Sequence, residues 1–386
     1  MSAKIRISPS FNRTTFLKET WQKKPKLLKG FIEHHGALIS PDELAGLACE
    51  EFLDARIIEH KENTETGSSW RLQNGPFQES DFAEMPKNNW TLLVQSVDQV
   101  NEKIFELQTL FDFIPRWRID DTMVSFATPG GGVGPHFDNY DVFLIQGKGS
   151  RKWRIGQRCG CDSLLASDTN LSILADFQTA EEFLVEEGDA LYIPPKFSHW
   201  GTSINDSVCY SVGFRAPSMV EMLQGFTDFL AENINIEERF VDRREKIPEN
   251  ISEISNDDLS ESYLRIKSMV DNKSHFLTWF GCHMTQPKYP NLVEASNDNC
   301  DKKIENGSTL KRSPHSRFAY SYGDNNEIML FADGEAFIFD RLHERSIKII
   351  CEASRIEISK LEGYLDSDNI RETITLLCAC GSLLIE

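Results

Sequence analysis

The sequence predicts a mixed α+β protein with a β sandwich or small barrel at its centre. Residues 119–215 contain six short β-rich segments separated by Gly, Pro and Asp, a spacing typical of such sheets. Apolar residues at helical spacing come before and after this region. With 386 residues, the chain is expected to form two to three domains.

The segments before the β region are expected to be helical or irregular. Trp21 precedes Pro25, and Pro41 opens a helical run that continues through Ala48. We therefore expect helices that flank a larger β domain. The six β-rich segments that follow are 123–127, 141–146, 151–156, 182–187, 190–195 and 209–214.

A second change of character comes after Pro217. Ser218 and Glu221 have the spacing of a capping box, and apolar residues follow at helical spacing. Residues 232–262 are rich in acidic side chains, which usually indicates a solvated face, and another helical stretch covers 259–279. These apolar helices can pack into a core or form a dimer seam, and the pattern alone leaves both open.

The last part of the chain predicts a small α+β unit of winged-helix size. Residues 290–316 are polar and contain two prolines, which is typical of a linker or long loop. Residues 327–339 form two apolar runs around Asp333-Gly334, which indicates a β-hairpin. Helical patterns near 356–362 and 367–380 complete the unit.

The charge balance favours a basic macromolecular partner. The chain has 41 Lys and Arg against 60 Asp and Glu, a net charge of −19. A nucleic acid would meet a repulsive field unless a local patch reverses it. The N-terminus has no unbroken apolar run of signal-peptide length, and no apolar stretch is long enough to span a membrane. We therefore expect a soluble cytoplasmic protein that does not bind a membrane.

The nine cysteines are expected to be reduced thiols, because an odd number does not suit a disulfide framework. Cys159 and Cys161 form one C-x-C pair, and Cys378 and Cys380 form another. Neither pair has the C-x-x-C spacing of a zinc knuckle. We therefore expect packed or surface thiols rather than a structural zinc site.

The most informative pattern is an H-x-D motif after a glycine-rich loop. His136 and Asp138 stand two residues apart in a segment predicted to be a strand edge, so their side chains share one face. His199 follows a Pro194-Pro195 turn several strands later. Two imidazoles and one carboxylate form the facial triad that holds Fe(II) and leaves coordination positions open. A hydrogen-bonded core histidine is the alternative interpretation of His136 alone.

A cation stands at a suitable distance from this motif. On a strand over 151–155, Arg151 and Trp153 point to one side and Lys152 and Arg154 to the other. If Arg151 faces the pocket, its guanidinium can bind a carboxylate with two hydrogen bonds. The alternative is a surface arginine on a basic strand.

The glycines at 130, 131, 132 and 134 do not indicate a phosphate-binding loop. The Gly-Lys-Ser/Thr of that motif is missing, and the next element is β rather than a helix. Close passage of the backbone beside a metal pocket explains them better, because glycine tolerates close approach and positive φ.

At these residues the chain resembles the cupin-like ribosomal oxygenases with a JmjC domain, and within them the bacterial protein-arginine hydroxylases. The resemblance covers 115–156, which contains PGGGVGPHFDNYDVF, together with 181–204 and 209–217. Residues 16–30 look like the opening of that family, while the C-terminal part matches only in layout.

The resemblance implies a double-stranded β-helix with flanking helices. It implies a catalytic domain over 1–217, a helical dimerisation region over 218–290 and a winged-helix-like domain over 291–386. The winged-helix segment carries no basic face interleaved with aromatic residues. We therefore do not expect direct binding of nucleic acid. The resemblance and the apolar helix pattern after Pro217 imply a homodimer.

The resemblance also implies the site residues and the reaction. His136, Asp138 and His199 match the Fe(II) ligands of the family, and Arg151 matches the residue that binds the distal carboxylate of 2-oxoglutarate. Further candidates for contact with the cosubstrate pocket are Ser211, Asn139 and Tyr140. The implied activity is O2-dependent hydroxylation of an arginine β-carbon in a large-subunit ribosomal protein, a basic substrate that suits an acidic enzyme.

Three alternatives remain open at this point. One is hydroxylation of a histidine in a ribosomal protein, which the metal site alone does not exclude. Another is a cupin metalloenzyme that does not use 2-oxoglutarate, in which Arg151 has no role. The last is a dimeric binding scaffold without enzymatic activity, which would tolerate loss of His136.

Overall fold

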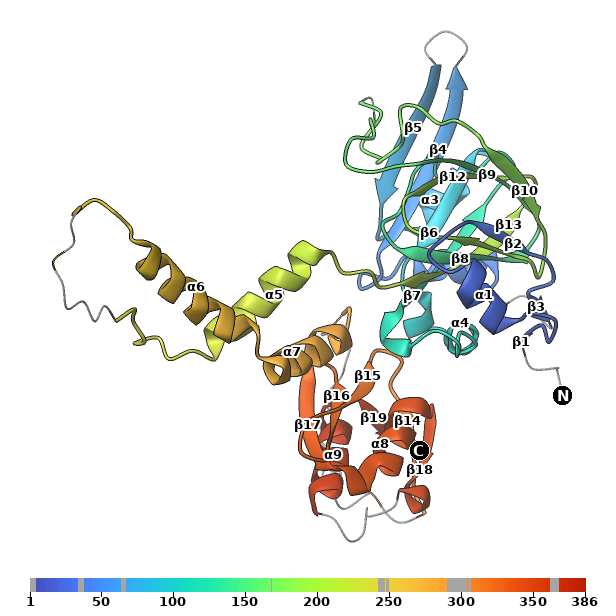
Figure 1. Ribbon diagram of the computed structural model, residues 1–386. Helices are drawn as coiled ribbons and strands as arrows, with labels where there is room; N and C mark the ends of the chain where they lie inside the picture. The colour runs from blue at the N-terminus through green and yellow to red at the C-terminus, as the bar shows by residue number, and fades with distance from the viewer. Residues whose placement is uncertain are drawn as a thin grey trace. The chain divides into compact units, whose positions relative to one another are not determined.

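The protein consists of two compact units, Met1–Ala216 and Pro217–Glu386. The computed structural model (Figure 1) describes residues 5–33, 38–63, 67–167, 169–241, 247, 250–289, 304, 307–361 and 368–386. Each unit is described by itself. The finer division of the chain at 217 and 290 stays a prediction.

The first unit is a double-stranded β-helix built from two facing antiparallel sheets, which confirms the expected fold class. The larger sheet has, in spatial order, β2 (Lys26–Leu28), β11 (Ala190–Ile193), β8 (Asp141–Lys148), β13 (Ser207–Phe214), β7 (Ile119–Ala127), β6 (Trp90–Val94), β4 (Ala55–Asn63) and β5 (Gly67–Asn74). The smaller sheet has β10 (Glu181–Val185), β9 (Arg151–Arg158) and β12 (Phe197–Ser203).

Short helices and a small strand pair accompany this β-helix (Figure 1). The strand pair is β1 (Arg6–Ile7) with β3 (Ile32–Glu33), and the helices are α1 (Arg13–Glu19), α2 (Pro41–Leu47), α3 (Glu79–Ala83), η1 (Val97–Gln99), α4 (Glu102–Thr109) and η2 (Arg116–Arg118). The predicted helix at Pro41 is confirmed, and a capping box between Ser40 and Glu43 starts it.

Side chains along the central strands point alternately to opposite faces of the sheet and so form two apolar layers. On β8, Phe143 and Ile145 pack among the residues that contact the flanking helices, while Val142 and Leu144 join a second cluster with Trp153 of the smaller sheet. Side chains two residues apart share a face. The space between the two sheets is therefore lined by the second set, and this is where the pocket lies.

Residues 55–94 correct one sequence expectation. They were expected to be helical or irregular, but they form β4, β5 and β6 in the larger sheet. These strands mix charged and apolar residues: β5 is the edge strand, and its exposed Arg71 pairs with the buried Glu59 of β4 (3.2 Å).

The second unit combines helices with two three-stranded antiparallel sheets. Its helices are α5 (Met219–Glu232), α6 (Asn256–Val270), α7 (Lys273–Thr285), η5 (Arg341–His343), α8 (Glu344–Glu352), η6 (Ile358–Lys360) and α9 (Asp368–Ala379). Its sheets are β18 (Arg355–Glu357), β14 (Thr309–Arg312) and β19 (Leu383–Ile385), and β15 (Phe318–Tyr322), β16 (Glu327–Ala332) and β17 (Glu335–Asp340).

Several sequence predictions for this unit can be compared with the structure. The capping box of Ser218 with Glu221 and the hairpin around Asp333-Gly334 are confirmed. The helix expected near 356–362 is wrong, because β18 and the short η6 lie there. Most of the expected linker 290–316 lies outside the described residues, and its end forms β14.

In the part of the chain that the structure describes, every helix is too short or too polar to cross a membrane.

A buried carboxyl pair under β7 makes the stability of the first unit depend on pH. Asp98 is fully enclosed next to Asp121, and its oxygens accept hydrogen bonds from the Thr122 amide (2.7 Å) and the Gln108 side chain (3.1 Å). Burial, and then the charge of Asp121, raises the pKa of Asp98 to about 7. In the unfolded chain this carboxyl has a pKa of about 4. The free energy of unfolding therefore decreases as the pH rises from about 4 to about 7, and the decrease levels off at higher pH.

We therefore predict that Asp98→Asn removes this pH dependence. Asparagine keeps the shape and can still accept from the Thr122 amide. Relative to wild type, the variant should gain about 2 kcal/mol of stability between pH 5.5 and pH 8. Chemical unfolding of the first unit at both pH values measures this gain, and an equal difference at both would contradict the prediction.

Candidate functional site

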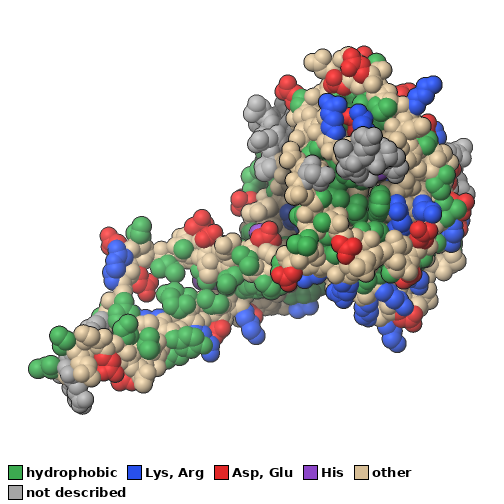
Figure 2. Space-filling view, turned by 90° about the horizontal axis from the view of Figure 1, so that it is seen from above, with side chains coloured by type: hydrophobic (Ala, Val, Ile, Leu, Met, Phe, Trp, Pro, Cys, Tyr) green, Lys and Arg blue, Asp and Glu red, His purple; other side chains and the backbone are tan. Residues whose placement is uncertain are grey.

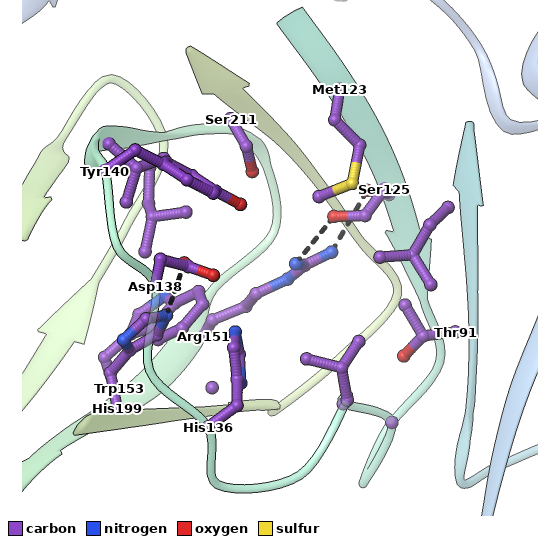
Figure 3. A pocket seen from close by; sticks show the side chains of 17 residues that line it. Thr91, Met123, Ser125, His136, Asp138, Tyr140, Arg151, Trp153, His199 and Ser211 are labelled. Carbon is purple, nitrogen blue, oxygen red and sulfur yellow. Dashed lines mark hydrogen bonds and ion pairs between the residues drawn. The ribbon is translucent and has the colours of Figure 1, made fainter. Parts of the chain in front are cut away.

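The metal-ligand candidates His136, Asp138 and His199 meet at one point between the two sheets (Figure 3). One potential ligand atom from each residue lies within 4.8 Å of the other two. The two imidazole ring centres are 4.3 Å apart, and the Asp138 carboxylate is 3.6 Å from His199 Nε2. Among the described residues this is the only cluster of three or more such side chains.

Backbone hydrogen bonds hold the two histidines together. The His136 amide donates to the His199 carbonyl (3.0 Å), and the His199 amide donates to the His136 carbonyl (2.8 Å). The Lys196 amide, at a positive-φ position after the Pro194-Pro195 turn, donates to the Asp138 carbonyl (2.6 Å). The loop after β7 is thus joined to β12 at both ends of the H-x-D motif.

The side-chain hydrogen bonds leave the inner ring nitrogens available. His136 Nδ1 lies 3.0 Å from the Gly134 carbonyl, and His199 Nδ1 lies 3.0 Å from the Phe197 carbonyl. Because a carbonyl only accepts, each Nδ1 carries the proton and each Nε2 keeps a lone pair. Burial and the neighbouring His136 lower the pKa of His199 to about 4, so this imidazole is neutral at physiological pH. This donor set suits a divalent transition-metal ion.

Two glycines allow the loop to approach this point closely. A Cβ at Gly131 would collide with the Trp90 carbonyl oxygen, and one at Gly132 would collide with the Gly201 carbonyl oxygen. The glycine-rich stretch therefore serves close backbone passage, as predicted, and a larger side chain here would push the loop away from the sheet.

Arg151 crosses from the smaller sheet to the larger one inside the pocket. Its guanidinium donates to the Ser207 and Ser125 hydroxyls (2.8 and 2.9 Å) and to the carbonyls of the same two residues (3.3 and 3.1 Å). All four partners are neutral, and no carboxylate of the described residues is within ion-pairing distance of it. Burial lowers the pKa of Arg151. A buried cation without an anion is costly, so this arrangement suits an anionic ligand.

The pocket offers about 90 Å³ to water-sized molecules, between Arg151 at one end and the histidine cluster at the other (Figure 3). Two buried polar groups in its lining make no hydrogen bond within the described structure: Thr91 Oγ1 and Trp153 Nε1. Sequence reasoning did not select Thr91, Ser125 or Ser207. In the sequence each of these residues is only a hydroxyl side chain at an inward-facing strand position. Many core strands contain such residues without binding a ligand.

The other candidates from the sequence divide into two groups. Ser211 and Tyr140 both line the pocket. The pKa of Tyr140 is raised by the surrounding protein and by Asp138, which accepts a hydrogen bond from its hydroxyl. Asn139 is exposed, and the structure does not bring it to the pocket. The reason is the direction of the chain after Asp138, which turns the side chain of Tyr140 inward instead.

The arrangement can therefore hold a metal ion at one end and an anionic group at the other, with open space between them. A ligand that spans both ends would need one or more metal-binding oxygens and a carboxylate. The cysteine pairs lie elsewhere: Cys159 and Cys378 are buried, whereas Cys161 and Cys380 are exposed.

Two family models match the chain. The JmjC domain matches residues 106–222, and a ROXA-like winged helix matches residues 268–383. The first match includes all three members of the histidine–aspartate cluster and Arg151.

Curated proteins and solved structures that are similar to most of the chain are also ribosomal oxygenases or hydroxylases. The ribosomal protein uL16 3-hydroxylase of Escherichia coli is 36% identical over 286 residues, which are 72% of this chain and 73% of that protein. A probable ribosomal oxygenase of Haemophilus influenzae is 33% identical over 55% of this chain and 52% of its own length. The X-ray structure of E. coli ycfD superposes with a TM-score of 0.87 at 29% identity and full coverage of both chains.

A further solved structure describes E. coli YcfD, a ribosomal oxygenase, in complex with cobalt and 2-oxoglutarate. It matches with a TM-score of 0.85 at 30% identity, covering 99% of this chain and all of that one. With the identity and coverage of the E. coli hydroxylase, these matches confirm the predicted family: this chain belongs to the JmjC-domain ribosomal oxygenases.

Proposed function

We propose that this chain is an Fe(II)- and 2-oxoglutarate-dependent hydroxylase of a large-subunit ribosomal protein, the counterpart of uL16, and that it acts on the β-carbon of an arginine side chain. The observation that carries the proposal is the pocket itself, in which the cluster of His136, Asp138 and His199 faces a buried Arg151 without an anionic partner. The 36% identity to a uL16 3-hydroxylase supports the choice of substrate.

In this proposal His136 and His199 bind iron through Nε2, and Asp138 binds through its carboxylate. Bound iron, with 2-oxoglutarate and O2, supplies the oxidising power: one oxygen atom enters the C–H bond and the other enters succinate, with release of CO2. The backbone bonds between His136 and His199 fix the two imidazoles before any ligand arrives. Preorganised ligands lose little entropy on binding.

Arg151 positions the cosubstrate by pairing with its distal carboxylate. Such charge-assisted hydrogen bonds are strong where water is excluded. The hydroxyl of Thr91 and the indole N–H of Trp153 are the lining groups left unbonded, so a carboxylate and its neighbouring oxygens can complete both. Ser125 and Ser207 hold the guanidinium in place by occupying its other N–H groups.

The substrate side chain would enter past Tyr140, which is 43% exposed while its hydroxyl meets Asp138. Ser211 adds a polar group to the same wall. The net charge of −19 attracts a basic ribosomal protein over distance. These features suit a cationic side chain such as arginine.

We further infer that the chain forms a homodimer through α5 and α6, and that it acts in the cytoplasm, where ribosomal proteins are made. Apolar side chains cover exposed parts of both helices, and Figure 2 shows such side chains gathered there. The exposed apolar residues of the two helices are Met219, Val220, Leu223, Leu259, Tyr263, Leu264, Ile266 and Val270. Helix α5 buries only Phe226 and Leu230, fewer apolar residues than its pattern provides. A second copy can cover the rest.

The principal test is hydroxylation of the ribosomal protein. The enzyme, supplied with Fe(II), 2-oxoglutarate and O2, should add one oxygen atom to the uL16 protein of its own organism, and fragmentation by mass spectrometry should place it on an arginine. His136→Ala should abolish the change, whereas His275→Ala, on exposed α7 surface, should not. An unchanged mass of uL16 would contradict the proposal, and oxygen on a histidine would favour the histidine-hydroxylase alternative.

A second prediction separates a 2-oxoglutarate enzyme from other cupin metalloenzymes. Arg151→Met keeps the packing but removes the charge, so the affinity for 2-oxoglutarate should fall at least about 30-fold. The affinity for Mn(II) alone should not change, because Arg151 lies at the other end of the pocket. Thr91→Val should weaken 2-oxoglutarate binding about three- to tenfold, the value of one hydrogen bond. Calorimetric titration without O2 measures both ligands.

Arg154→Met is the matched control for this titration. Arg154 lies on the same strand but on the outer side, where it stacks on Trp200 at 3.7 Å. Its replacement should leave the affinity for 2-oxoglutarate unchanged. If Arg151→Met also left it unchanged, Arg151 would not be the carboxylate anchor.

A third prediction tests the dimer. Leu223→Glu combined with Val220→Glu places two charges on the exposed face of α5 and should convert a dimer into a monomer in sedimentation experiments. Leu342→Glu, at a still more exposed apolar position on η5, serves as the control and should remain dimeric. A monomeric wild-type protein at micromolar concentration would contradict the inference.

A further inference from the structure

The N-terminal segment reverses the charge of the rest of the chain. Residues 5–30 contain seven Lys or Arg and a single acidic residue, Glu19, in a protein whose net charge is −19. This segment includes β1, α1 and β2 of the first unit. An acidic protein thus carries a basic N-terminal segment.

Three of these cations are neutralised within the fold. Arg6 pairs with Glu33 (2.7 Å), Arg13 pairs with Asp112 (3.2 Å), and Lys29 pairs with both Asp189 (2.7 Å) and Glu186 (3.0 Å). These pairs are explained as local structural contacts.

The remaining four cations are Lys18, Lys23, Lys24 and Lys26, which we call the lysine turn. Within the described part of the chain, no carboxylate is within ion-pairing distance of any of them. Lys18, Lys23 and Lys24 are exposed and Lys26 is half-buried. Four lysines within nine residues create a positive field that the fold does not cancel.

The lysine turn has a fixed shape. Lys23 and Lys24 both donate backbone hydrogen bonds to the Thr20 carbonyl (2.9 and 3.2 Å), and the ammonium of Lys23 lies against the Lys18 carbonyl. Trp21 stacks on the buried Tyr192 with ring centres 5.5 Å apart. The charges are therefore presented on a rigid surface, not on a loose tail.

The turn is also tied to strands β8 and β11 of the larger sheet. The backbone N–H of Gln22, a positive-φ residue, donates to the Tyr192 hydroxyl (2.7 Å), and its side chain donates to Asp141 (3.1 Å). Asp141 begins β8 three residues after Asp138. Arg118 also pairs with Asp141 (3.2 Å). The lysine turn is therefore fixed at the end of β8 that follows the H-x-D motif, on the face of the strand opposite the pocket-lining Val142 and Leu144.

We propose that the lysine turn binds the phosphate backbone of RNA, and so holds a substrate protein that is already associated with RNA. This inference rests on the proposed function, because a ribosomal protein is the substrate whose natural partner is RNA. A basic protein surface would be repelled by the lysine turn, whereas phosphates are attracted. Partition into a membrane would need exposed apolar side chains near the lysines, and within the described residues 5–30 Leu17, 37% exposed, is the only exposed large hydrophobic residue.

The expectation that the chain does not bind nucleic acid came from its overall negative charge and from the absence of a basic face on the winged-helix segment. Neither observation concerns the N-terminal segment, and phosphate contacts depend on the local field within about 10 Å at 0.1 M salt. The lysine turn is a patch of the kind that can reverse the overall repulsion.

The test measures the binding of a fluorescent single-stranded RNA of about 20 nucleotides by anisotropy at several salt concentrations. With about four phosphate contacts, the slope of log affinity against log salt should be about −3. The variant Lys18→Glu, Lys23→Glu, Lys24→Glu should bind at least about tenfold more weakly at low salt, with a slope near −1, since about one contact remains. The neutral variant Lys18→Gln, Lys23→Gln, Lys24→Gln should fall between the two.

The matched control replaces three exposed lysines elsewhere on the same unit by glutamate: Lys61, Lys87 and Lys148. It makes the same change in net charge and should bind RNA within about twofold of wild type, because distant charges are screened. Equal losses in the control and the lysine-turn variant would overturn the proposal, as would no RNA binding by wild type at 50 mM salt. Salt-dependent binding of phosphatidylglycerol vesicles without binding of RNA would also overturn it.

The outcome can be separated from that of the proposed hydroxylase activity. RNA binding is measured without iron, 2-oxoglutarate or protein substrate, so it can fail while an isolated uL16 peptide is still hydroxylated. The lysine-turn variant should hydroxylate that peptide at the wild-type rate, which also shows that it is folded. A variant that lost both activities together would overturn the assignment of RNA binding to these lysines.

Discussion

The pair of backbone hydrogen bonds between His136 and His199 is the constraint on which the site depends. It joins a glycine-rich loop to a strand of the smaller sheet, and the two residues are 63 positions apart in sequence. Side-chain contacts alone would let the loop move whenever a ligand leaves. Because the bond is made by the backbone, the imidazoles stay aligned, and the outer Nδ1 contacts with backbone carbonyls set both tautomers. The metal cluster is therefore a property of the fold, present before a metal binds.

The other end of the pocket is organised by a different balance of forces. Arg151 gains four hydrogen bonds from Ser125 and Ser207, yet these neutral groups do not replace the hydration of a full positive charge. The fold bears this cost and recovers it when an anion binds. The same reasoning applies on a smaller scale to Thr91 and Trp153, whose polar atoms are buried without partners. The unpaired polar groups at this end lower the stability of the ligand-free fold and raise its affinity for an anionic ligand. The protein is therefore more stable with the pocket filled.

The elements that could be predicted from the sequence are those in which the pattern of apolar residues matches the burial of the element in the folded protein. The strand β8 has an unbroken apolar run over Val142–Ile145 because both of its faces are buried, and its segment stands out in the sequence. The strand β4 carries a buried carboxylate, Glu59, that pairs with Arg71 of the edge strand β5, and this mixed composition hid the strand. At the site, the motif of His136 and Asp138 carried enough chemistry to be recognised. Thr91 did not, because a threonine next to a buried tryptophan on β6 gives no sign of facing a ligand.

The distribution of charge links recognition to chemistry. Arginine-rich ribosomal proteins and their RNA carry opposite charges, so an enzyme with uniform charge would attract one and repel the other. This chain separates the two signs, with an acidic majority and a basic turn held by Gln22 beside Asp141. With RNA bound at the lysine turn as proposed, attraction at both surfaces orients a protein–RNA substrate before its side chain enters the pocket. Orientation at that stage raises the frequency of productive encounters without changing the metal cluster.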